Sequence, residues 1–280
     1  MGQELLKIKG SDVNIDLCIG TITHNGEIRA KTQKCLDQAI RYMHSKGYTM
    51  AMRRETGSLI PLSRNRIAEM AVEISAKCLI FVDADMVFAE DAMEKLLKHD
   101  RDIISGLCTQ RAAPYMPVAK MRTKEGGYLV AEGVGSGRLI EVDGIGSAFV
   151  CIKPRVFEAL NQPYYAIPAV NSMQDYVEAI EDIKTVLASY TDTRETLINR
   201  LKDTLLKHQG KPKNRSLVGE DYFFCEKARM EGFKIFVDTS LHIGHLGEKP
   251  YCYDDYLEYK KYRDAQKDIP KDAEAVNAVT

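Results

Sequence analysis

The sequence of 280 residues contains no tryptophan, no Cys-x-x-Cys pair and no apolar run as long as a membrane span. Its seven cysteines are scattered, and several lie in apolar, strand-like runs. We therefore expect reduced cysteines, and neither a disulfide framework nor a zinc site. The N-terminal residues lack the apolar centre of a signal peptide, and no membrane-spanning helix is expected. Together these absences predict a cytoplasmic protein.

A strong net charge is also lacking, because 39 Lys and Arg nearly balance 40 Asp and Glu, for a net charge of −1. Bulk charge alone would therefore not hold nucleic acid, although local basic patches are compatible with this balance. With 45% hydrophobic and 28% charged residues, the composition is that of a globular protein. The length suits one large α/β domain, or such a domain with a small addition.

The chain does contain a short apolar run that ends in two acids. Cys78–Val82 is rich in β-branched and aromatic residues, which predicts a buried strand, and Asp83 and Asp85 follow it with one residue between them. An Asp-x-Asp tripeptide alone is common in loops and helix caps, but the carboxyl end of a strand is where open α/β sheets bind ligands. Two neighbouring acids repel each other and need a cation. A divalent metal ion that binds a diphosphate meets that need.

Alternating strand and helix patterns surround this run. We predict strands at Ile15–Gly20 and Tyr48–Arg53, and helices at Ile28–His44 and from Pro61 onward, with Ser63 as a candidate cap. Strand, helix, strand, helix, strand is the βαβ pattern of a mostly parallel sheet with right-handed crossovers.

Three segments further along have other patterns. The glycines of Gly133–Gly137 are similar to part of a dinucleotide-binding fingerprint, but a strand pattern at Arg138–Val142 follows them, which favours a hairpin turn. Two apolar stripes at helical spacing, in 171–189 and 192–208, predict an inserted helical hairpin that serves as core or subunit contact. Residues 251–280 form a C-terminal tail whose tyrosine-rich first part gives way to a polar end, and that end is expected to be poorly ordered.

Two downstream segments complete a recognisable set. Gly219–Asp221 (Gly-Glu-Asp) opens a predicted helix, and a predicted strand at Phe233–Val237 leads to Gly244–Gly247 (Gly-His-x-Gly). With the Asp-x-Asp run, these segments resemble the GT-A glycosyltransferases, and most of all the family-2-like enzymes that are common in bacteria and bacteriophages. The amino-acid sequences of two more segments, Ser63–Asn65 and Phe81–Val87, strengthen the resemblance. It covers residues 15 to about 247 except the helical insertion.

The resemblance implies a Rossmann-like GT-A fold, with a mostly parallel sheet, flanking helices and the inserted hairpin. Residues 1–160 would form the nucleotide-sugar-binding core, 161–217 the insertion, 218–250 the acceptor and metal part of the same core, and 251–280 the tail. It also implies a nucleoside-diphosphate sugar donor, with UDP expected, and Mn²⁺ or Mg²⁺ as the cofactor. A nitrogen ligand favours Mn²⁺.

Individual roles follow from the same resemblance. The metal ligands would be Asp85, Asp83 and His245, with His242 as a less favoured substitute for His245. Asp83 would contact the ribose if it does not contact the metal. The nucleotide would be contacted by Thr21, Thr23, Arg64 and Asn65.

An acceptor hydroxyl must also lose its proton. If the sugar's configuration inverts, a carboxylate opposite the leaving group acts as general base, and Asp221 is the candidate, with Glu220 in reserve. If the configuration is retained, both acids would bind sugar or acceptor hydroxyls. A plainer alternative is that both acids stabilise a helix N-terminus. The sequence leaves the stereochemistry open.

The acceptor is open as well. The resemblance to bacteriophage enzymes suggests hydroxymethylated pyrimidines in DNA as the acceptor. Surface glycan, lipid-linked sugar and protein are the alternative acceptors. Two other functions remain open. One is a nucleotidyltransferase, although Gly20–Arg29 lacks the glycine-rich, basic loop of such enzymes. The other is a non-catalytic sugar-binding or assembly protein. A homo-oligomer through the helical insertion is a further expectation. The candidate phosphate contacts are Arg53, Arg54, Lys120, Arg122, Lys124 and Lys207–Arg215.

Overall fold

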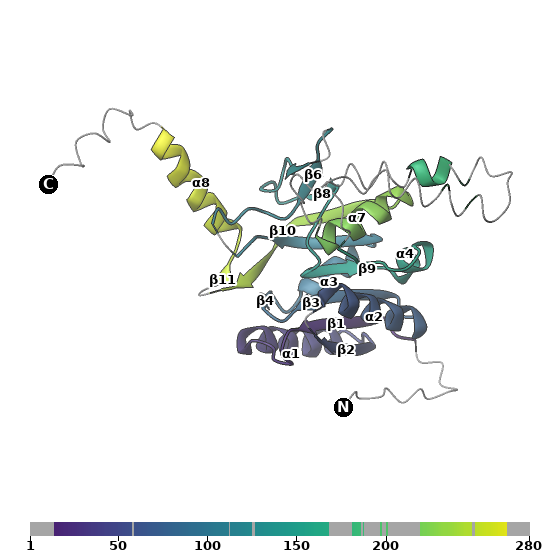
Figure 1. The fold of residues 1–280 in the computed structure, drawn as a ribbon. Coiled ribbons are helices and arrows are strands. Elements are labelled where there is room, and N and C mark those ends of the chain that lie inside the picture. Colours follow the sequence, from purple (N-terminus) through teal and green to yellow (C-terminus); the bar gives the residue numbers. More distant parts are fainter. Residues whose placement is uncertain are drawn as a thin grey trace.

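The computed structural model shows a mixed α/β fold in which helices flank one central sheet (Figure 1). It describes residues 14–57, 59–111, 113–124, 127–167, 181–185, 187, 197, 200, 219–247 and 250–267. The predicted helical hairpin and the basic connector lie largely outside these residues, so they stay predictions, as does the oligomer contact assigned to the hairpin.

The central sheet has the strand order β11-β10-β5-β9-β3-β1-β2, and β4 and β8 pair with β10. The strands are β1 (Leu17–Thr23), β2 (Met50–Thr56), β3 (Cys78–Asp83), β4 (Met86–Val87), β5 (Ile103–Cys108), β8 (Leu139–Val142), β9 (Phe149–Ile152), β10 (Ile235–Leu246) and β11 (Pro250–Tyr251). β1 is parallel to β2 and β3, and β5 is parallel to β10. β9 is antiparallel to both β3 and β5, so β3 and β5 point the same way. The five strands β1, β2, β3, β5 and β10 are therefore all parallel, and β9 runs against them. The predicted α/β class with a mostly parallel sheet is confirmed.

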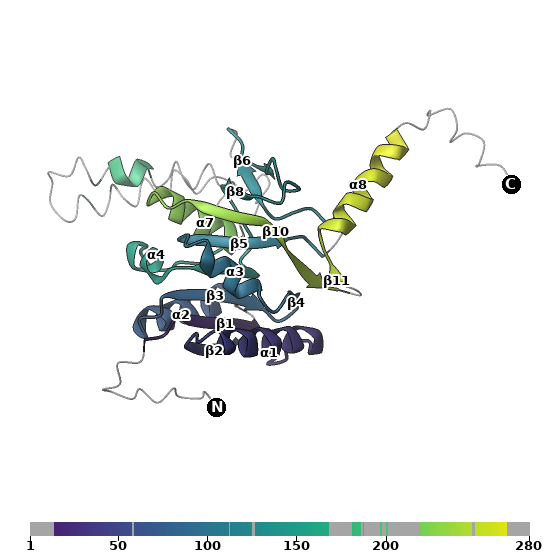
Figure 2. The ribbon, with the colours of Figure 1, turned by 180° about the vertical axis from the view of Figure 1, so that it is seen from behind.

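Helices cover both faces of this sheet (Figure 2). They are α1 (Ala30–Ser45), α2 (Ile60–Glu73), α3 (Ala92–Lys98), α4 (Pro154–Ala159) and α7 (Glu220–Met230). Ile67 of α2, Phe157 of α4 and Phe224 of α7 belong to one buried apolar cluster. Leu36 of α1 and Met93 of α3 belong to a second. The strands therefore have apolar side chains on both faces, as their nearly continuous hydrophobic runs predict.

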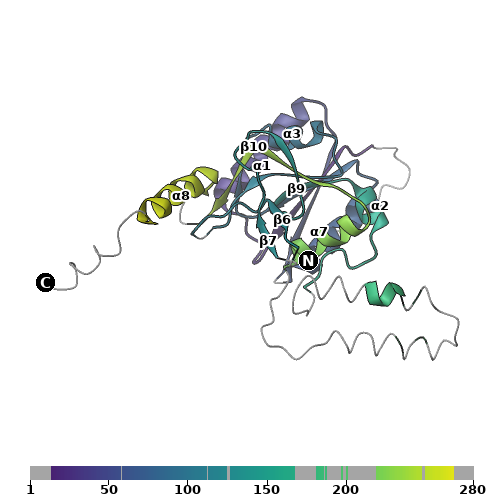
Figure 3. The ribbon, with the colours of Figure 1, turned by 90° about the horizontal axis from the view of Figure 1, so that it is seen from above.

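Two smaller parts adjoin the sheet. β6 (Lys120–Arg122) and β7 (Tyr128–Val130) form a two-stranded ribbon. Helix α8 (Tyr253–Lys267) extends away from the sheet (Figure 3), and its Tyr259 ring contacts Tyr115 edge to face, with ring centroids 6.5 Å apart. The tyrosine-rich first part of the C-terminal tail is thus helical as far as Lys267, and the prediction of a poorly ordered end lies outside the described residues.

The strand that contains the two histidines is longer than predicted. His242 and His245 lie within β10, and not in a loop after it. A register shift between Asp238 and His242 takes up the irregular stretch, and pairing with β5 then resumes. A bulge of this kind lets a strand continue past a break in its alternating pattern. Both histidines are therefore on sheet backbone, which positions them more rigidly than a loop would.

Two other predictions have different outcomes. Ser63 is buried inside α2, which begins at Ile60, so Ser63 does not cap this helix. Gly133–Gly137 leads into β8 and not into the helix of a dinucleotide-binding fingerprint, but β7 pairs with β6 and β8 with β10, so the segment does not close the predicted hairpin. Across the described residues, no helix is long and apolar enough to cross a membrane.

Candidate functional site

A cavity of about 670 Å³ lies at the carboxyl ends of β1 and β3. This volume is within the usual range for small-molecule sites. Its walls come from the end of β1 and the loop after it, the start of α2, the turn after β3, the loop after β5, and β10. The lining residues are Ile22, Thr23, His24, Asn25, Glu27, Ile28, Arg29, Gly57, Ile60, Asp83, Ala84, Asp85, Arg111 and His245.

Strand pairing brings Asp85 and His245 together, although they are far apart in the chain. Asp85 lies on the turn between β3 and β4, and β4 pairs with β10 so that Met86 is opposite His245. The Leu246 amide donates to the Asp85 carbonyl oxygen at 2.7 Å. Backbone pairing alone therefore holds the Asp85 and His245 side chains next to each other, without the help of a ligand.

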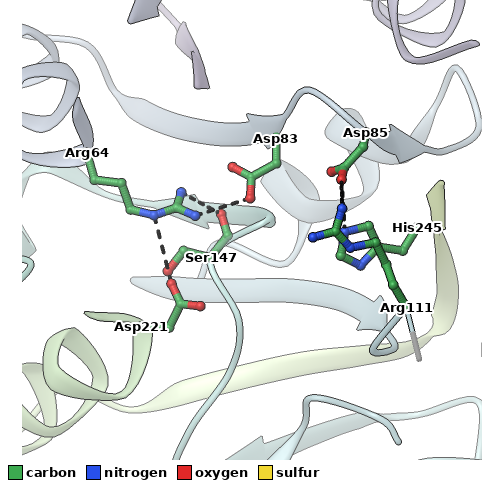
Figure 4. Close-up of polar contacts among 7 residues, drawn as sticks. All are labelled: Arg64, Asp83, Asp85, Arg111, Ser147, Asp221 and His245. Carbon is green, nitrogen blue, oxygen red and sulfur yellow. Dashed lines mark hydrogen bonds and ion pairs between the residues drawn. The ribbon is translucent and has the colours of Figure 1, made fainter. Parts of the chain in front are cut away.

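The Asp85 carboxylate has two nitrogen-containing neighbours, His245 and Arg111 (Figure 4). Its Oδ2 lies 3.3 Å from His245 Nε2 and 2.9 Å from Arg111 Nη1. Burial acts to raise the pKa of Asp85, but the hydrogen bond and charge of His245 and the charge of Arg111 outweigh it, and the pKa lies below its usual value. Asp85 is therefore an anion at neutral pH.

His245 is oriented by a second contact. Its Nδ1 lies 3.3 Å from the Thr109 carbonyl oxygen. A carbonyl only accepts hydrogen bonds, so Nδ1 carries the proton that it donates. Nε2 then faces the Asp85 oxygen, and that contact is favourable with either a second proton on the ring or a cation between the two atoms. A metal-binding histidine is usually oriented in this way, through its other ring nitrogen.

Asp83 has a different environment, because it faces the buried Arg64 of α2 (Figure 4). Asp83 Oδ2 accepts from Arg64 Nη2 at 3.2 Å, and Arg64 Nη1 donates to the Ser147 carbonyl oxygen at 3.1 Å. Burial raises the pKa of Asp83, and the charge of Arg64 only partly offsets this effect. The Arg64 side chain is 3% exposed and that of Asp83 is 28% exposed, so the contact joins a buried guanidinium to a carboxylate that also lines the cavity.

Arg64 also faces the first turn of α7. Its Nε lies 3.8 Å from Asp221 Oδ1. Burial raises the pKa of Asp221, against the opposing charge of Arg64, and burial together with the charge of Asp221 raises the pKa of Glu220. One guanidinium thus lies between two carboxylates from distant parts of the chain, Asp83 and Asp221. The Oδ1 atoms of both acids are buried and have no hydrogen-bond partner among the described residues.

The other residues expected to contact a nucleotide are distributed unevenly. Thr23 lines the cavity, but Thr21 is buried in β1 and does not line it. Asn65 accepts from the Tyr165 amide and donates to the Tyr165 carbonyl, both at 2.9 Å. Arg64, Asn65 and Thr21 do not line the cavity, and Arg64 and Asn65 have polar partners within the protein, so their nucleotide contacts stay predictions.

Of the two histidines, only His245 faces the cavity. The His242 side chain is exposed, with its ring 5.9 Å from that of Tyr253. Arg111, Thr109 and Ser147 were not singled out from the sequence. Thr109 and Arg111 directly follow β5, so the rule that ligands gather at the carboxyl ends of parallel strands points to them. No comparable signal points to Ser147, which precedes an antiparallel strand.

The donor atoms fit a metal ion that shares its ligands with a substrate. Among the described residues, no group of three or more His, Cys, Asp or Glu side chains is placed to hold a metal. Asp85 and His245 would supply two ligands to such an ion, and Asp83 is turned toward Arg64. Mg²⁺ and similar ions are often held by one or two carboxylates together with substrate phosphates, and an imidazole nitrogen is compatible with Mn²⁺.

No protein-family model matches the chain, and no curated protein matches it in sequence. Solved structures with a similar backbone include A197 from STIV, at 13% identity and a TM-score of 0.45, over 83% of this chain and 86% of that one. A second is a glycosyltransferase involved in the glycosylation of the major capsid of PBCV-1. Its identity is 13% and its TM-score 0.31, over 58% of this chain and 73% of that one. A third is mannose-1-phosphate geranyltransferase from Thermus thermophilus. Its identity is 11% and its TM-score 0.37, over 82% of this chain and 76% of that one. Likeness at this level assigns no activity, substrate or partner to this chain.

Proposed function

We propose that this protein is a metal-dependent glycosyltransferase that moves a sugar from a nucleoside-diphosphate sugar, with UDP as the first nucleotide to test, to an acceptor hydroxyl. One observation carries the proposal: Asp85 and His245 lie 3.3 Å apart in a cavity at the carboxyl ends of parallel strands. A carboxylate and an oriented imidazole nitrogen with room for a nucleotide beside them are suited to a metal–diphosphate complex.

Each part of the cavity has a role in this proposal. Asp85 and His245 hold Mn²⁺ or Mg²⁺, which when bound stabilises the negative charge that develops on the departing diphosphate. Arg29 and Arg111 also line the cavity, and fixed positive charge favours a diphosphate there. Thr23, His24 and Asn25 offer polar groups to the nucleoside at the end of β1.

Asp221 is the proposed general base if the reaction inverts configuration. Its raised pKa places proton uptake closer to neutral pH than for an ordinary aspartate, which suits a base that must accept a proton and release it again. It does not line the cavity, and Arg64 lies between it and Asp83. An acceptor would therefore approach from the α7 side. Glu220, next to it, is the reserve candidate or a ligand for hydroxyl groups.

The structure bears on the choice of acceptor through the basic side chains. Of those proposed for DNA phosphates, Arg53 pairs with Glu55, Arg122 pairs with Glu226 and Lys120 is buried, which leaves Arg54 and Lys124 as the exposed ones among the described residues. Phosphate contacts require accessible charge. We therefore favour a glycan-type hydroxyl acceptor over hydroxymethylated DNA, and both belong in an acceptor screen.

The test is hydrolysis of nucleoside-diphosphate sugars with and without Mn²⁺, in the parent protein and in Asp85→Asn. We expect release of the nucleoside diphosphate only when metal is present, and its loss in the variant. Asp102→Asn, at an acid paired with the exposed Arg155, is the matched control and should keep the activity.

The products distinguish the alternatives. Pyrophosphate release from a nucleoside triphosphate and a sugar phosphate would indicate a nucleotidyltransferase. Donor binding with no turnover of any acceptor would indicate a non-catalytic sugar-binding protein. Hydrolysis that needs neither metal nor Asp85 would overturn the proposed site.

A further inference from the structure

The Asp85 oxygen that faces His245 also has a second, exposed partner. Arg111 Nη1 lies 2.9 Å from Oδ2, the same atom that lies 3.3 Å from His245 Nε2. The Arg111 side chain is 54% exposed, whereas that of Asp85 is 19% exposed. Ion pairs with one exposed member are weak and exchange easily, because solvent screens them and the long side chain loses entropy on pairing.

The loop that contains Arg111 is closed at its base by backbone hydrogen bonds, although the Arg111 side chain is exposed. The Gln110 amide donates to the Met116 carbonyl at 3.0 Å, and the Val118 amide donates to the Cys108 carbonyl at 3.1 Å. The guanidinium can therefore change partners by side-chain rotation alone, while its attachment point stays at the cavity.

A divalent ion and Arg111 cannot both be held close to this oxygen. A guanidinium 2.9 Å from an oxygen that binds a dication would be strongly repelled, since like charges a few ångströms apart interact unfavourably even at the dielectric of a protein surface. The donor's diphosphate would offer Arg111 another anion within the same cavity, and guanidinium groups bind phosphate oxygens in a bidentate manner.

We propose that Arg111 is an exchangeable cation: it pairs with Asp85 in the free protein and contacts the substrate's diphosphate once metal and donor are bound. This inference rests on the proposed function, because it assumes that a metal ion binds to Asp85 and a diphosphate to the cavity. It gives Arg111 two effects of opposite sign, which a merely structural residue would not have.

The experiment measures Mn²⁺ binding to the protein without donor, by electron paramagnetic resonance, and then UDP binding at saturating Mn²⁺, by calorimetry. Arg111→Met should bind Mn²⁺ about three- to tenfold more tightly than the parent, because a competing cation has been removed. The same variant should bind UDP about tenfold more weakly, since a charge-assisted contact to phosphate is lost. Arg111→Lys should lie between the two, and Arg155→Met, at an exposed pair away from the cavity, should match the parent.

Each other outcome rejects a defined part of the argument. If the parent and Arg111→Met bind Mn²⁺ equally, or the variant binds it more weakly, the exchange is rejected and the metal site stands. If the variant binds Mn²⁺ more tightly but UDP unchanged, Arg111 only competes with the metal, and its contact with the diphosphate is rejected. If neither protein binds Mn²⁺, the metal site of the proposed function fails, and the exchange fails with it.

Discussion

Asp83 and Asp85 are separated by a single residue, yet their surroundings have little in common. Asp83 faces Arg64, a guanidinium that is 3% exposed and also contacts the Ser147 carbonyl and Asp221. Asp85 faces His245 and Arg111 at the cavity, and Arg111 is 54% exposed. The pKa of Asp83 is raised, with burial as the main cause, whereas charges around Asp85 lower its pKa despite burial.

The difference shows how one short acidic segment serves two purposes. Both acids line the cavity, but Asp83 is paired with a buried guanidinium and Asp85 with an exposed one. The Arg64 pairing joins α2, β3, α7 and Ser147, so it contributes to the shape of the site. The Arg111 pairing is the one that we propose is exchanged when ligands bind. Substitutions at the acids and their partners test this division, in decreasing order of expected effect.

Arg64→Met should have the largest effect. Removing one partner from a buried ionic group costs about 3–5 kcal/mol of unfolding free energy, because the remaining charges lose their compensation. In the variant, the folded-state pKa values of Asp83 and Asp221 rise further above their unfolded values. The destabilisation should therefore be greater at pH 7 than at an acidic pH, because these acids take up protons as the pH falls. Urea unfolding at both pH values measures it.

The exposed pair Arg155–Asp102 supplies the control for Arg64, because Arg155→Met should cost less than about 1 kcal/mol at either pH. Equal losses in the two variants would show that Arg64 has no special structural role.

Asp85→Asn and Asp83→Asn should separate ligand binding from structure. Asp85→Asn should lower metal-dependent donor hydrolysis by about 10²–10³-fold, the effect of removing one strong electrostatic group from an active site, with little change in unfolding free energy. Asp83→Asn should keep most of its Mn²⁺ affinity and lose stability instead. Mn²⁺ titration combined with urea unfolding gives both quantities. Loss of Mn²⁺ binding in Asp83→Asn would mean that Asp83 is a metal ligand after all.

Asp221→Asn should lower kcat by about 10²-fold and change KM little, if Asp221 is the general base. A base must be unprotonated, and the pKa of Asp221 is raised, so kcat of the parent should fall with decreasing pH at a value above that of an ordinary aspartate. The variant should lack this acid limb. Glu220→Gln is the matched neighbour, and retention of kcat in Asp221→Asn would exclude the assignment.

Asn65→Ala should have the smallest effect, and only on stability. It removes two hydrogen bonds to the Tyr165 backbone, which should cost about 1–2 kcal/mol. Donor affinity, measured by calorimetry, should not change. A fall in donor affinity with normal stability would restore the nucleotide contact expected from the sequence.

The sequence was most informative where local patterns decide the outcome. The buried run Cys78–Val82 and the βαβ alternation predicted the sheet, and the acids after β3 were expected at its carboxyl end. The orientation of side chains was less accessible, because it depends on partners that are distant in the chain. Arg64 was expected to contact a nucleotide, but Asp83 and Asp221 together stabilise its charge in the interior.

Two features of the site follow from sheet pairing that no local pattern encodes. His245 is next to Asp85 because β4 pairs with β10 across a register that includes a bulge. The contact of Arg111 with Asp85 became known only from the structure of the loop after β5. The family resemblance had already placed Asp85 and His245 on one metal ion, so only the contact of Arg111 with Asp85 was absent from the sequence analysis.

The antiparallel direction of β9 has one more consequence. A strand that runs against its neighbours begins where they end, so the chain enters β9 at the same rim where β3 and β5 finish. There the Ala148 carbonyl accepts from the Asp83 amide at 2.9 Å, next to the Ser147 carbonyl that contacts Arg64. The length of the glycine-containing approach, residues 143–146, thereby helps to set the position of the active-site frame. Insertions or deletions there should alter substrate preference while leaving the cavity's own side chains untouched.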